Sequence, residues 1–230
     1  MTLHILSAGA AKGLIGGLAP QFERAEGHGV QGPFGAVGAM KAKYAAGEPC
    51  DVIVLTAAMI AALGEAGELV EGSAADIGTV RTGVAVPAGS ELPDVATALG
   101  LRNALVRASA VYFPDPQHAT AGIHAMRVLG SLGIGEPLEP RLRTYPNGAT
   151  AMAAMAESGG PGAIGITQVT EILYTPGVQL VGVLPPEFEL ATVYSMAVTR
   201  RAADPALAAR FVALVTGAGA RALRRDGGFE

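Results

Sequence analysis

Asp51-Val-Ile-Val-Leu-Thr56 is the stretch that decides the fold, and residues 57–63 follow it directly. The first segment is a short apolar run rich in β-branched residues, which predicts a buried strand, and the second has helical spacing. Two further strand–helix pairs precede it, at 3–6 with 10–22 and at 30–35 with 36–46. Three such pairs in succession predict a parallel sheet with crossover helices.

The same alternation resumes after residue 93. We predict strands at 110–113, 141–145, 163–166 and 178–184, and helices at 120–132, at 149–157, near Glu171 and from Asp204-Pro205 to Gly217. A strand at 83–87 leaves the first set and a long strand at 191–199 returns towards it. The order predicts an α/β fold with two lobes, each a mainly parallel sheet flanked by helices and joined by two hinge strands. Lobe 1 is expected to be discontinuous (1–82 and 195–230), lobe 2 to span 83–194, and the ligand cleft to lie between them.

Composition excludes several classes of protein. The chain has 230 residues, of which 50% are hydrophobic and 16% charged, so it is not disordered. The net charge is −4 and no run of Lys and Arg exceeds two residues, which argues against a nucleic-acid partner. A single cysteine, Cys50, excludes an internal disulfide and a cysteine-based zinc cluster. The 32 glycines punctuate short apolar runs and indicate frequent tight turns.

The beginning of the sequence runs directly into the first predicted strand, without the pattern of a secretory signal. No apolar run is long enough for a membrane helix, so no membrane insertion is expected. These features predict a soluble protein that is cytoplasmic as written, or periplasmic if the chain is a trimmed mature form. We expect a monomer with no metal and no cofactor.

Six predicted strand-to-helix junctions are rich in glycine, alanine, serine and threonine. They lie at 7–9, 35–38, 56–57, 115–120, 147–150 and 167–168. In open α/β sheets, ligands bind beyond the carboxyl ends of the strands, where the following helices present free N–H groups that suit an anion. Any one junction could be merely a tight loop. Six together predict a cleft that holds a small anion.

An ordered series of segments carries a family resemblance along nearly the whole chain. The segments are 7–12, 34–38, 49–54, 83–86, 115–116, 120–123, 165–168, 178–185 and 192–194. The chain resembles the type II periplasmic binding proteins, in the molybdate-binding-protein-like branch of ABC-transporter solute receptors, to which aconitate isomerase-like enzymes are similar. The resemblance implies two lobes that close over a ligand, and an ABC-transporter permease as a partner if the chain is exported.

The chain departs from the molybdate receptors that it resembles. Those receptors hold a tetrahedral oxyanion with hydroxyls in the first two loops and a tyrosine in the last. Here Ala10, Ala36 and Gln168 stand at these places, and only the backbone N–H of Ala121 fits the pattern. Since a hydrogen bond to a charged group is worth about 1.5–3 kcal/mol, we expect a carboxylate rather than molybdate or tungstate. Arg and Lys side chains can anchor separate carboxyl groups.

The predicted ligand-binding residues combine the junctions, the resemblance and the cations near the cleft. They are Ser7, Gly9, Ala10, Lys12, Gly35, Ala36, Thr56, Arg81, His118, Thr120, Ala121, Asn147, Thr150 and Gln168. Several have ordinary alternatives: Lys12 could be a solvated surface lysine, Arg81 a tether between lobes, and His118 a capping or surface histidine. A GxGxxG pattern at 27–32 follows a predicted helix and leads into a strand, which is the wrong context for a dinucleotide site.

Three functions remain open from the sequence. We favour a binding protein that captures a small carboxylate or other anion without chemistry. The second is a cofactor-independent isomerase that shifts a C=C bond in an unsaturated di- or tricarboxylate, with Lys12, His118 and Glu171 as candidate acid–base residues. Glu171 could instead be an ordinary acid at a helix N-terminus. The third is a ligand-sensing regulator, which the lack of an attached DNA-binding module disfavours.

Overall fold

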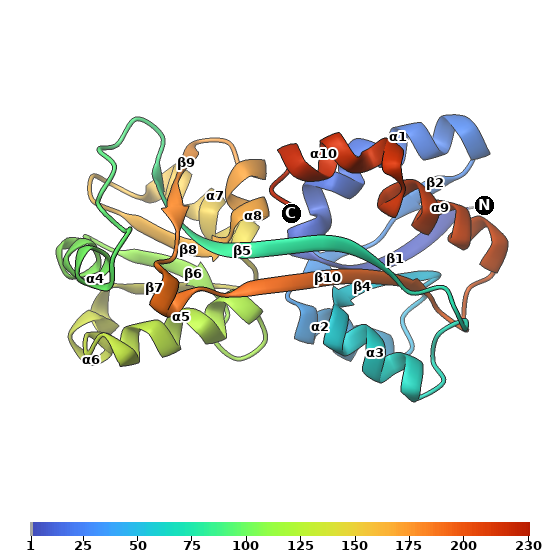
Figure 1. The fold of residues 1–230 in the computed structure, drawn as a ribbon, viewed down its shortest axis with the longest axis horizontal. Helices are drawn as coiled ribbons and strands as arrows, with labels where there is room; N and C mark the ends of the chain where they lie inside the picture. Colours follow the sequence, from blue (N-terminus) through green and yellow to red (C-terminus); the bar gives the residue numbers. More distant parts are fainter. Residues whose placement is uncertain (1) are drawn as a thin grey trace. The chain divides into compact units, whose positions relative to one another are not determined.

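The computed structural model describes residues 2–230, and the chain divides into two compact units (Figure 1). Unit 1 comprises the chain up to Val80 together with Thr192–Glu230, and unit 2 comprises Arg81–Ala191. The chain passes from one unit to the other twice, within strand β5 (Ala75–Pro87) and at the start of strand β10 (Ala191–Val198).

The sheet of unit 1 is built around strand β1 (Thr2–Ala8). It pairs in parallel with β2 (Gly29–Gln31), β3 (Phe34–Gly35) and β4 (Val52–Thr56). Strand β10 runs antiparallel to β4. The helical segments are η1 (Gly9–Ala11), α1 (Lys12–Glu26), α2 (Val37–Ala45), α3 (Ala57–Glu65), α9 (Pro205–Thr216), η4 (Ala218–Ala220) and α10 (Arg221–Asp226). Figure 1 shows α1, α9 and α10 on one side of this sheet and α2 and α3 on the other. The rings of Phe22 and Phe211, 5.0 Å apart between centroids, pack α1 on α9.

The single strand predicted at 30–35 is two short strands, because Gly32 and Pro33 interrupt it. A Cβ at Gly32 would lie 1.8 Å from the carbonyl oxygen of Ile5, so only glycine permits this approach. Pro33 has no N–H for the ladder, but its carbonyl accepts from the N–H of Ser7 at 3.2 Å. The break aligns the end of β3 with the end of β1.

The sheet of unit 2 places β6 (Val111–Pro114) between β7 (Leu142–Tyr145) and β8 (Ile164–Gln168), all parallel. Strand β5 runs antiparallel to β8 and to β9 (Val178–Val183). The helical segments are α4 (Ala98–Arg107), α5 (Thr120–Ser131), α6 (Gly135–Leu138), η2 (Glu139–Arg141), α7 (Gly148–Ser158), α8 (Val169–Tyr174) and η3 (Pro186–Phe188).

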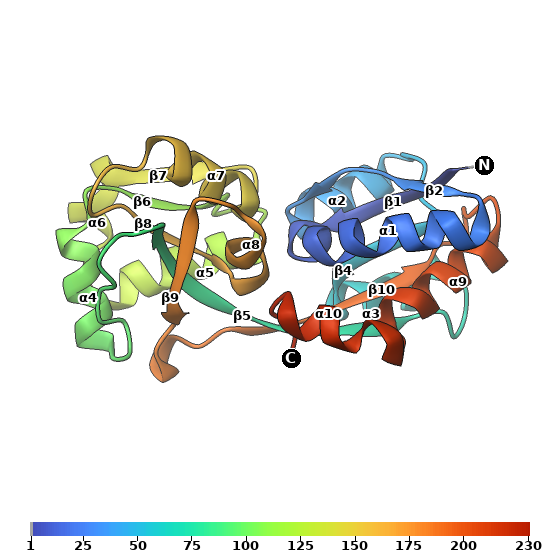
Figure 2. The ribbon, with the colours of Figure 1, turned by 90° about the horizontal axis from the view of Figure 1, so that it is seen from above.

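Two apolar clusters cover the two faces of the unit 2 sheet. One packs α4, α5 and α6 against Val84 and Ile166, and the other packs α7 and α8 against Ala85 and Tyr112. Figures 1 and 2 show these helices on opposite sides of the strands. Residues 82, 84 and 86 of β5 therefore share one face with residues 164, 166 and 168 of β8, because side chains alternate along a strand.

The α/β class is confirmed, but the expectation of mainly parallel sheets is only partly right. Strands β5, β9 and β10 make the sheets mixed. An apolar strand has the same pattern in either direction, so the sequence did not show which strands run against their neighbours. Helix α4 was also not predicted, although Thr97 caps it by accepting from the N–H of Gly100 at 3.0 Å.

Cys50 is buried in unit 1, and its thiol donates to the carbonyl of Val52. Burial raises the pKa of the thiol to about 12, so it is not a nucleophile at neutral pH.

In the part of the chain that the structure describes, no single helix is long and apolar enough to cross a membrane. Helix α9 and the segment Ala218–Asp226 reach that length and composition only as a pair bent by 45°.

Candidate functional site

The predicted ligand residues of unit 1 gather where its parallel strands end. The register places Ala8 opposite Gly35 in β3 and Ser7 opposite Val54 in β4. The ends of β1, β3 and β4 therefore lie at one edge of the sheet, and η1, α2 and α3 begin there. This edge brings together Ser7, Gly9, Ala10, Lys12, Gly35, Ala36 and Thr56.

The helical segments at this edge of unit 1 do not begin alike. Ala8 precedes η1 and Ala36 precedes α2, and neither side chain can cap the first-turn N–H groups. Thr56 does cap α3, since its Oγ1 accepts from the N–H of Met59 at 3.4 Å. The hydroxyl of Ser7 is buried and donates to the carbonyl of Ala8 at 3.1 Å. Backbone donors, with the half-exposed cation of Lys12 beside them, therefore dominate this edge.

In unit 2 a tight turn after β6 holds His118. The Oδ1 atom of Asp115 accepts from the N–H groups of Gln117 at 2.6 Å and His118 at 3.0 Å, and its Oδ2 lies 3.1 Å from Nδ1 of His118. These contacts, the Gln117 N–H foremost, hold the pKa of Asp115 below its ordinary value. The imidazole is 56% exposed. With Nδ1 held by Asp115, Nε2 is the ring atom directed to other partners.

Helix α5 begins close against the end of β6. Ala119 precedes it without a capping side chain, Ala121 is buried, and Thr120 is half-exposed. A Cβ at Gly122 would lie 2.2 Å from the carbonyl oxygen of Asp115 and 2.3 Å from that of Pro114. The glycine therefore allows the first turn to sit on the strand end with its N–H groups uncapped.

Helix α7, after β7, begins in the opposite way. The Oδ1 atom of Asn147 accepts from both the N–H and the hydroxyl of Thr150, each at 2.9 Å. The carboxylate of Glu171 is buried and accepts from Thr167 Oγ1 at 2.6 Å and from the backbone N–H groups of Gly148, Ala149 and Gln168. Burial raises the pKa of Glu171, and these hydrogen bonds oppose the rise.

The geometry of Glu171 therefore differs from that of a free base. Glu171 belongs to helix α8, but its carboxylate caps the start of the neighbouring helix α7. A Cβ at Gly148 would lie 2.0 Å from Oε2 of Glu171, so this contact also requires glycine. The sequence suggested either an acid at the N-terminus of its own helix or a base. The structure has Glu171 in the first turn of α8, and its carboxylate also caps the neighbouring helix α7.

Two further predicted residues differ in exposure and in the partners of their side chains. Arg81 forms an ion pair with Glu189 at 3.2 Å within unit 2, and both side chains are more than a third exposed. Gln168, at the end of β8, is 3% exposed, and neither Nε2 nor Oε1 has a hydrogen-bond partner.

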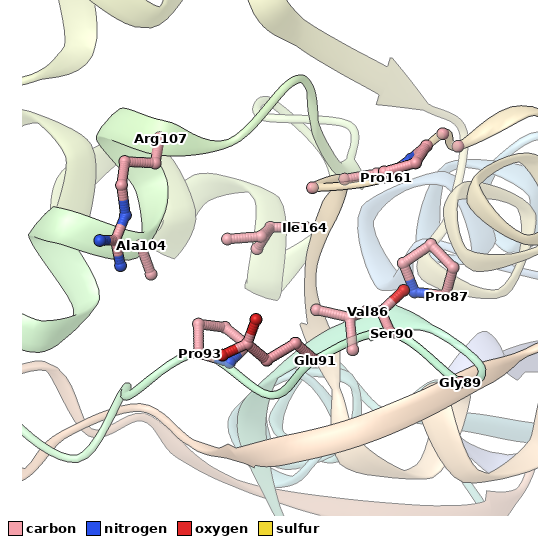
Figure 3. A pocket seen from close by; sticks show the side chains of 14 residues that line it. Val86, Pro87, Gly89, Ser90, Glu91, Pro93, Ala104, Arg107, Pro161 and Ile164 are labelled. Atoms are coloured by element: carbon pink, nitrogen blue, oxygen red, sulfur yellow. The ribbon is translucent and has the colours of Figure 1, made fainter.

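Two pockets, one in each unit, are lined by none of the predicted ligand residues. A pocket of about 660 Å³ in unit 2 adjoins Ile164 (Figure 3). Ile164 begins β8, whereas Gln168 ends it. Glu91 and Arg107 are its charged lining residues, and glycines and prolines form much of the rest. A pocket of about 610 Å³ in unit 1 lies between α3 and the start of β5. Within residues 2–230, no three His, Cys, Asp or Glu side chains are grouped so as to hold a metal ion.

Residues 3–230 match the family of bacterial extracellular solute-binding proteins. The chain belongs to this family. The resemblance to periplasmic binding proteins seen in the sequence is thereby confirmed. The match spans nearly the whole of this solute-binding protein, so both units and both passages between them belong to the family pattern.

Solved structures show the same fold. The periplasmic molybdate-binding protein of Azotobacter vinelandii matches with a TM-score of 0.81 at 22% identity, over 99% of this chain and 98% of that chain. The sulfate-binding protein of Mycobacterium tuberculosis matches with a TM-score of 0.73 at 19% identity, over 100% and 86%. Among curated proteins, an aconitate isomerase from a Pseudomonas species is 26% identical over 212 residues, covering 89% of this chain and 78% of the relative.

Sequence reasoning missed two residues of this solute-binding protein that shape its candidate site. Asp115 orients His118, and the Asp-x-x-His spacing of a turn was the available signal. Thr82 lies opposite Gln168 in the ladder between β5 and β8. No local pattern could have paired residues 86 positions apart, because their register depends on how the sheet assembles.

Proposed function

We propose that this solute-binding protein captures a small anion, a carboxylate in preference to molybdate. The observation that carries the proposal is the absence of side-chain caps at three of the six predicted ligand junctions. η1, α2 and α5 begin after Ala8, Ala36 and Ala119 without a capping side chain. Thr56 and Asn147 cap α3 and α7, and the Glu171 carboxylate accepts from the N–H of Gln168 at the start of α8. First-turn N–H groups without a cap are donors for an anion.

The chemistry of these junctions favours a carboxylate. Ala10 and Ala36 follow β1 and β3, and the Ser7 hydroxyl already donates to the carbonyl of Ala8, so these two junctions offer a tetrahedral oxyanion no unused hydroxyl donor. The cationic Lys12 and the imidazole of His118, whose Nε2 is directed outward, lie in different units. Polar groups on separate elements suit a ligand with more than one carboxylate, because each can bind its own carboxyl group.

The wider arrangement implied by the resemblance is part of the same proposal. We infer that the junctions of both units serve one ligand in a cleft between two lobes, with β5 and β10 as hinge strands. If the chain is exported, an ABC-transporter permease receives the ligand. A monomer suffices for this role.

A thermal-stability panel tests the proposal. Citrate, L-malate, succinate and trans-aconitate should raise the melting temperature of the protein more than molybdate or sulfate at equal concentration, because a ligand that binds only the folded state stabilises it. A Lys12→Ala variant should lose much of the shift, and a Lys41→Ala variant, whose lysine lies on the exposed side of α2, should keep it. A larger shift with molybdate than with any carboxylate contradicts the proposal.

A second candidate function rests on the Asp115–His118 pair. An oriented imidazole with its Nε2 directed outward can accept and return a proton, as an isomerase of an unsaturated di- or tricarboxylate requires. A base removes a proton from one carbon, the C=C bond shifts, and a proton returns two carbons away, so no oxidant or cofactor is needed. The curated relative named above is an aconitate isomerase.

Proton NMR in deuterated water separates the two functions. Incubation with cis- or trans-aconitate should leave a receptor's ligand unchanged. Solvent deuterium in the ligand, or a new isomer, indicates catalysis. His118→Gln should abolish that signal, whereas His28→Gln, on the loop before β2, should not. Turnover that survives His118→Gln rules out His118 as the proton-transfer residue.

A further inference from the structure

Three buried polar side chains of unit 2 have no hydrogen-bond partner. They belong to Thr82, Gln168 and Thr170, and Gln168 lacks a partner for its donor Nε2 as well as its acceptor Oε1. Thr82 is 1% exposed and Gln168 3% exposed. Buried polar groups are nearly always paired, because removing them from water without a partner is unfavourable. A site with both an unused donor and an unused acceptor therefore calls for a ligand group that offers both.

Thr82 and Gln168 form one local cluster. They are directly opposite in the antiparallel ladder between β5 and β8, so their side chains project on the same face with Cβ atoms about 4.5–5.5 Å apart. No hydrogen bond joins them. Thr82 is held in place through its backbone, which donates to Leu190 at 3.0 Å and accepts from Leu184 at 3.1 Å.

The face that carries this pair also carries helix α5. Residues 164, 166 and 168 of β8 face α5, which packs on both β6 and β8. Because β6 and β8 are parallel, the start of α5 after β6 lies at the same sheet edge as Gln168. Uncapped N–H groups of α5 and a buried, unpartnered amide thus occur together in one unit.

We propose that Gln168 and Thr82 recognise a hydroxyl group next to the anionic group of the ligand, so that the preferred ligand is a hydroxycarboxylate. This inference rests on the proposed anion-binding function. A deprotonated oxyanion or a plain carboxylate offers only acceptors and leaves Oε1 of Gln168 without a donor. A ligand hydroxyl donates to Oε1 and accepts from Nε2 or from the Thr82 hydroxyl.

Matched ligands that differ by one hydroxyl test the inference. Calorimetry compares citrate with propane-1,2,3-tricarboxylate and L-malate with succinate, at about pH 8, where ordinary carboxyl groups are ionised. The protein should bind the hydroxylated member at least about tenfold more tightly, because the analogue leaves a buried acceptor unpaired. Gln168→Leu and Thr82→Val should bring this ratio close to one.

Gln179→Leu is the matched control. Its amide lies in unit 2 but donates to the carbonyl of Ser90 at 2.9 Å, so this variant should keep the preference for the hydroxylated ligands. Gln168→Leu breaks no hydrogen bond of the structure and should unfold no earlier than the unaltered protein. If Gln168→Leu fails to fold, Thr82→Val carries the test.

The failures of the inference and of the proposed function are distinguishable. Equal affinity within both ligand pairs, or a preference that persists in Gln168→Leu and Thr82→Val, overturns the hydroxyl subsite and leaves anion capture standing. A preference that exists only at acid pH assigns the donor to a protonated carboxyl and also overturns it. No binding of any carboxylate in the thermal panel overturns both.

Discussion

Helices α5 and α7 follow neighbouring parallel strands of unit 2, yet they begin in opposite ways. The first turn of α7 is closed by Asn147 and by the buried carboxylate of Glu171, while α5 begins after Ala119 with no capping side chain. Both junctions end in the same dipeptide, Ala-Thr, at 119–120 and at 149–150. The difference teaches that a strand-to-helix junction offers donors to a ligand only when no side chain from elsewhere has already accepted them.

The largest effect on stability is expected from a substitution at the capped start of α7. Gly148→Ala places a methyl group 1.9 Å from Thr167 Oγ1 and 2.0 Å from Glu171 Oε2, so it should lower the free energy of unfolding by about 3 kcal/mol. Urea denaturation measures the change. Gly130→Ala in α5 is the control, since nothing lies within 4 Å of its Cβ and it should be neutral or stabilising. If Gly148→Ala leaves the free energy of unfolding unchanged, the close contact of Gly148 with Thr167 and Glu171 is contradicted.

Removal of the distant cap should have the next largest effect. Glu171→Ala leaves a cavity and leaves the N–H groups of Gly148 and Ala149 without their acceptor, which should cost about 2–3 kcal/mol. Amide hydrogen exchange should speed up at the start of α7 and remain unchanged at the start of α5. Equal protection of α7 in both proteins contradicts a capping role.

The same carboxyl group predicts the direction of a pH effect. Its pKa is raised in the folded state above the ordinary 4.5, so between about pH 4.5 and the folded pKa the folded chain holds a proton that the unfolded chain has lost. Its contribution to stability is therefore complete below about pH 4.5 and falls as the pH rises through that window, by at most about 1.4 kcal/mol per unit. Urea titrations of the protein and of Glu171→Gln, which lacks the titration, should diverge only there; parallel curves contradict the raised pKa.

The smallest effects on stability are expected when the cap of α7 is removed and a cap is added to α5. Asn147→Ala should cost about 1 kcal/mol, because α7 loses its side-chain cap. Ala119→Ser, at a residue with extended φ and ψ, should stabilise α5 by about 0.5–1 kcal/mol. The serine should also weaken citrate binding by calorimetry, since its oxygen takes an N–H group that the ligand needs. Unchanged citrate affinity contradicts a role for the start of α5 in binding.

The sequence predicted much of the fold but less of the candidate site. The run 51–56, the helix after it and the Asp204 cap of α9 are local patterns, and the structure has β4, α3 and α9 there. Ser7, Gly35 and Ala36 were expected together and do share a sheet edge. The partners of Glu171 and the exposure of His118 were not predictable, because side-chain packing and not spacing sets them.

By itself, the sequence determined the alternation of strands and helices, the glycines at their junctions and the absence of a hydroxyl at Ala10 and Ala36. These features depend on periodicity and residue type within a few positions of one another. Only the tertiary structure decided that β5 runs antiparallel to β8, that Glu171 caps α7, and that the side chains of Thr82 and Gln168 lie opposite each other without a hydrogen bond. The pairing of Thr82 with Gln168 depends on sheet register, and the cap by Glu171 depends on side-chain packing. Both join residues far apart in the chain and leave no local signal.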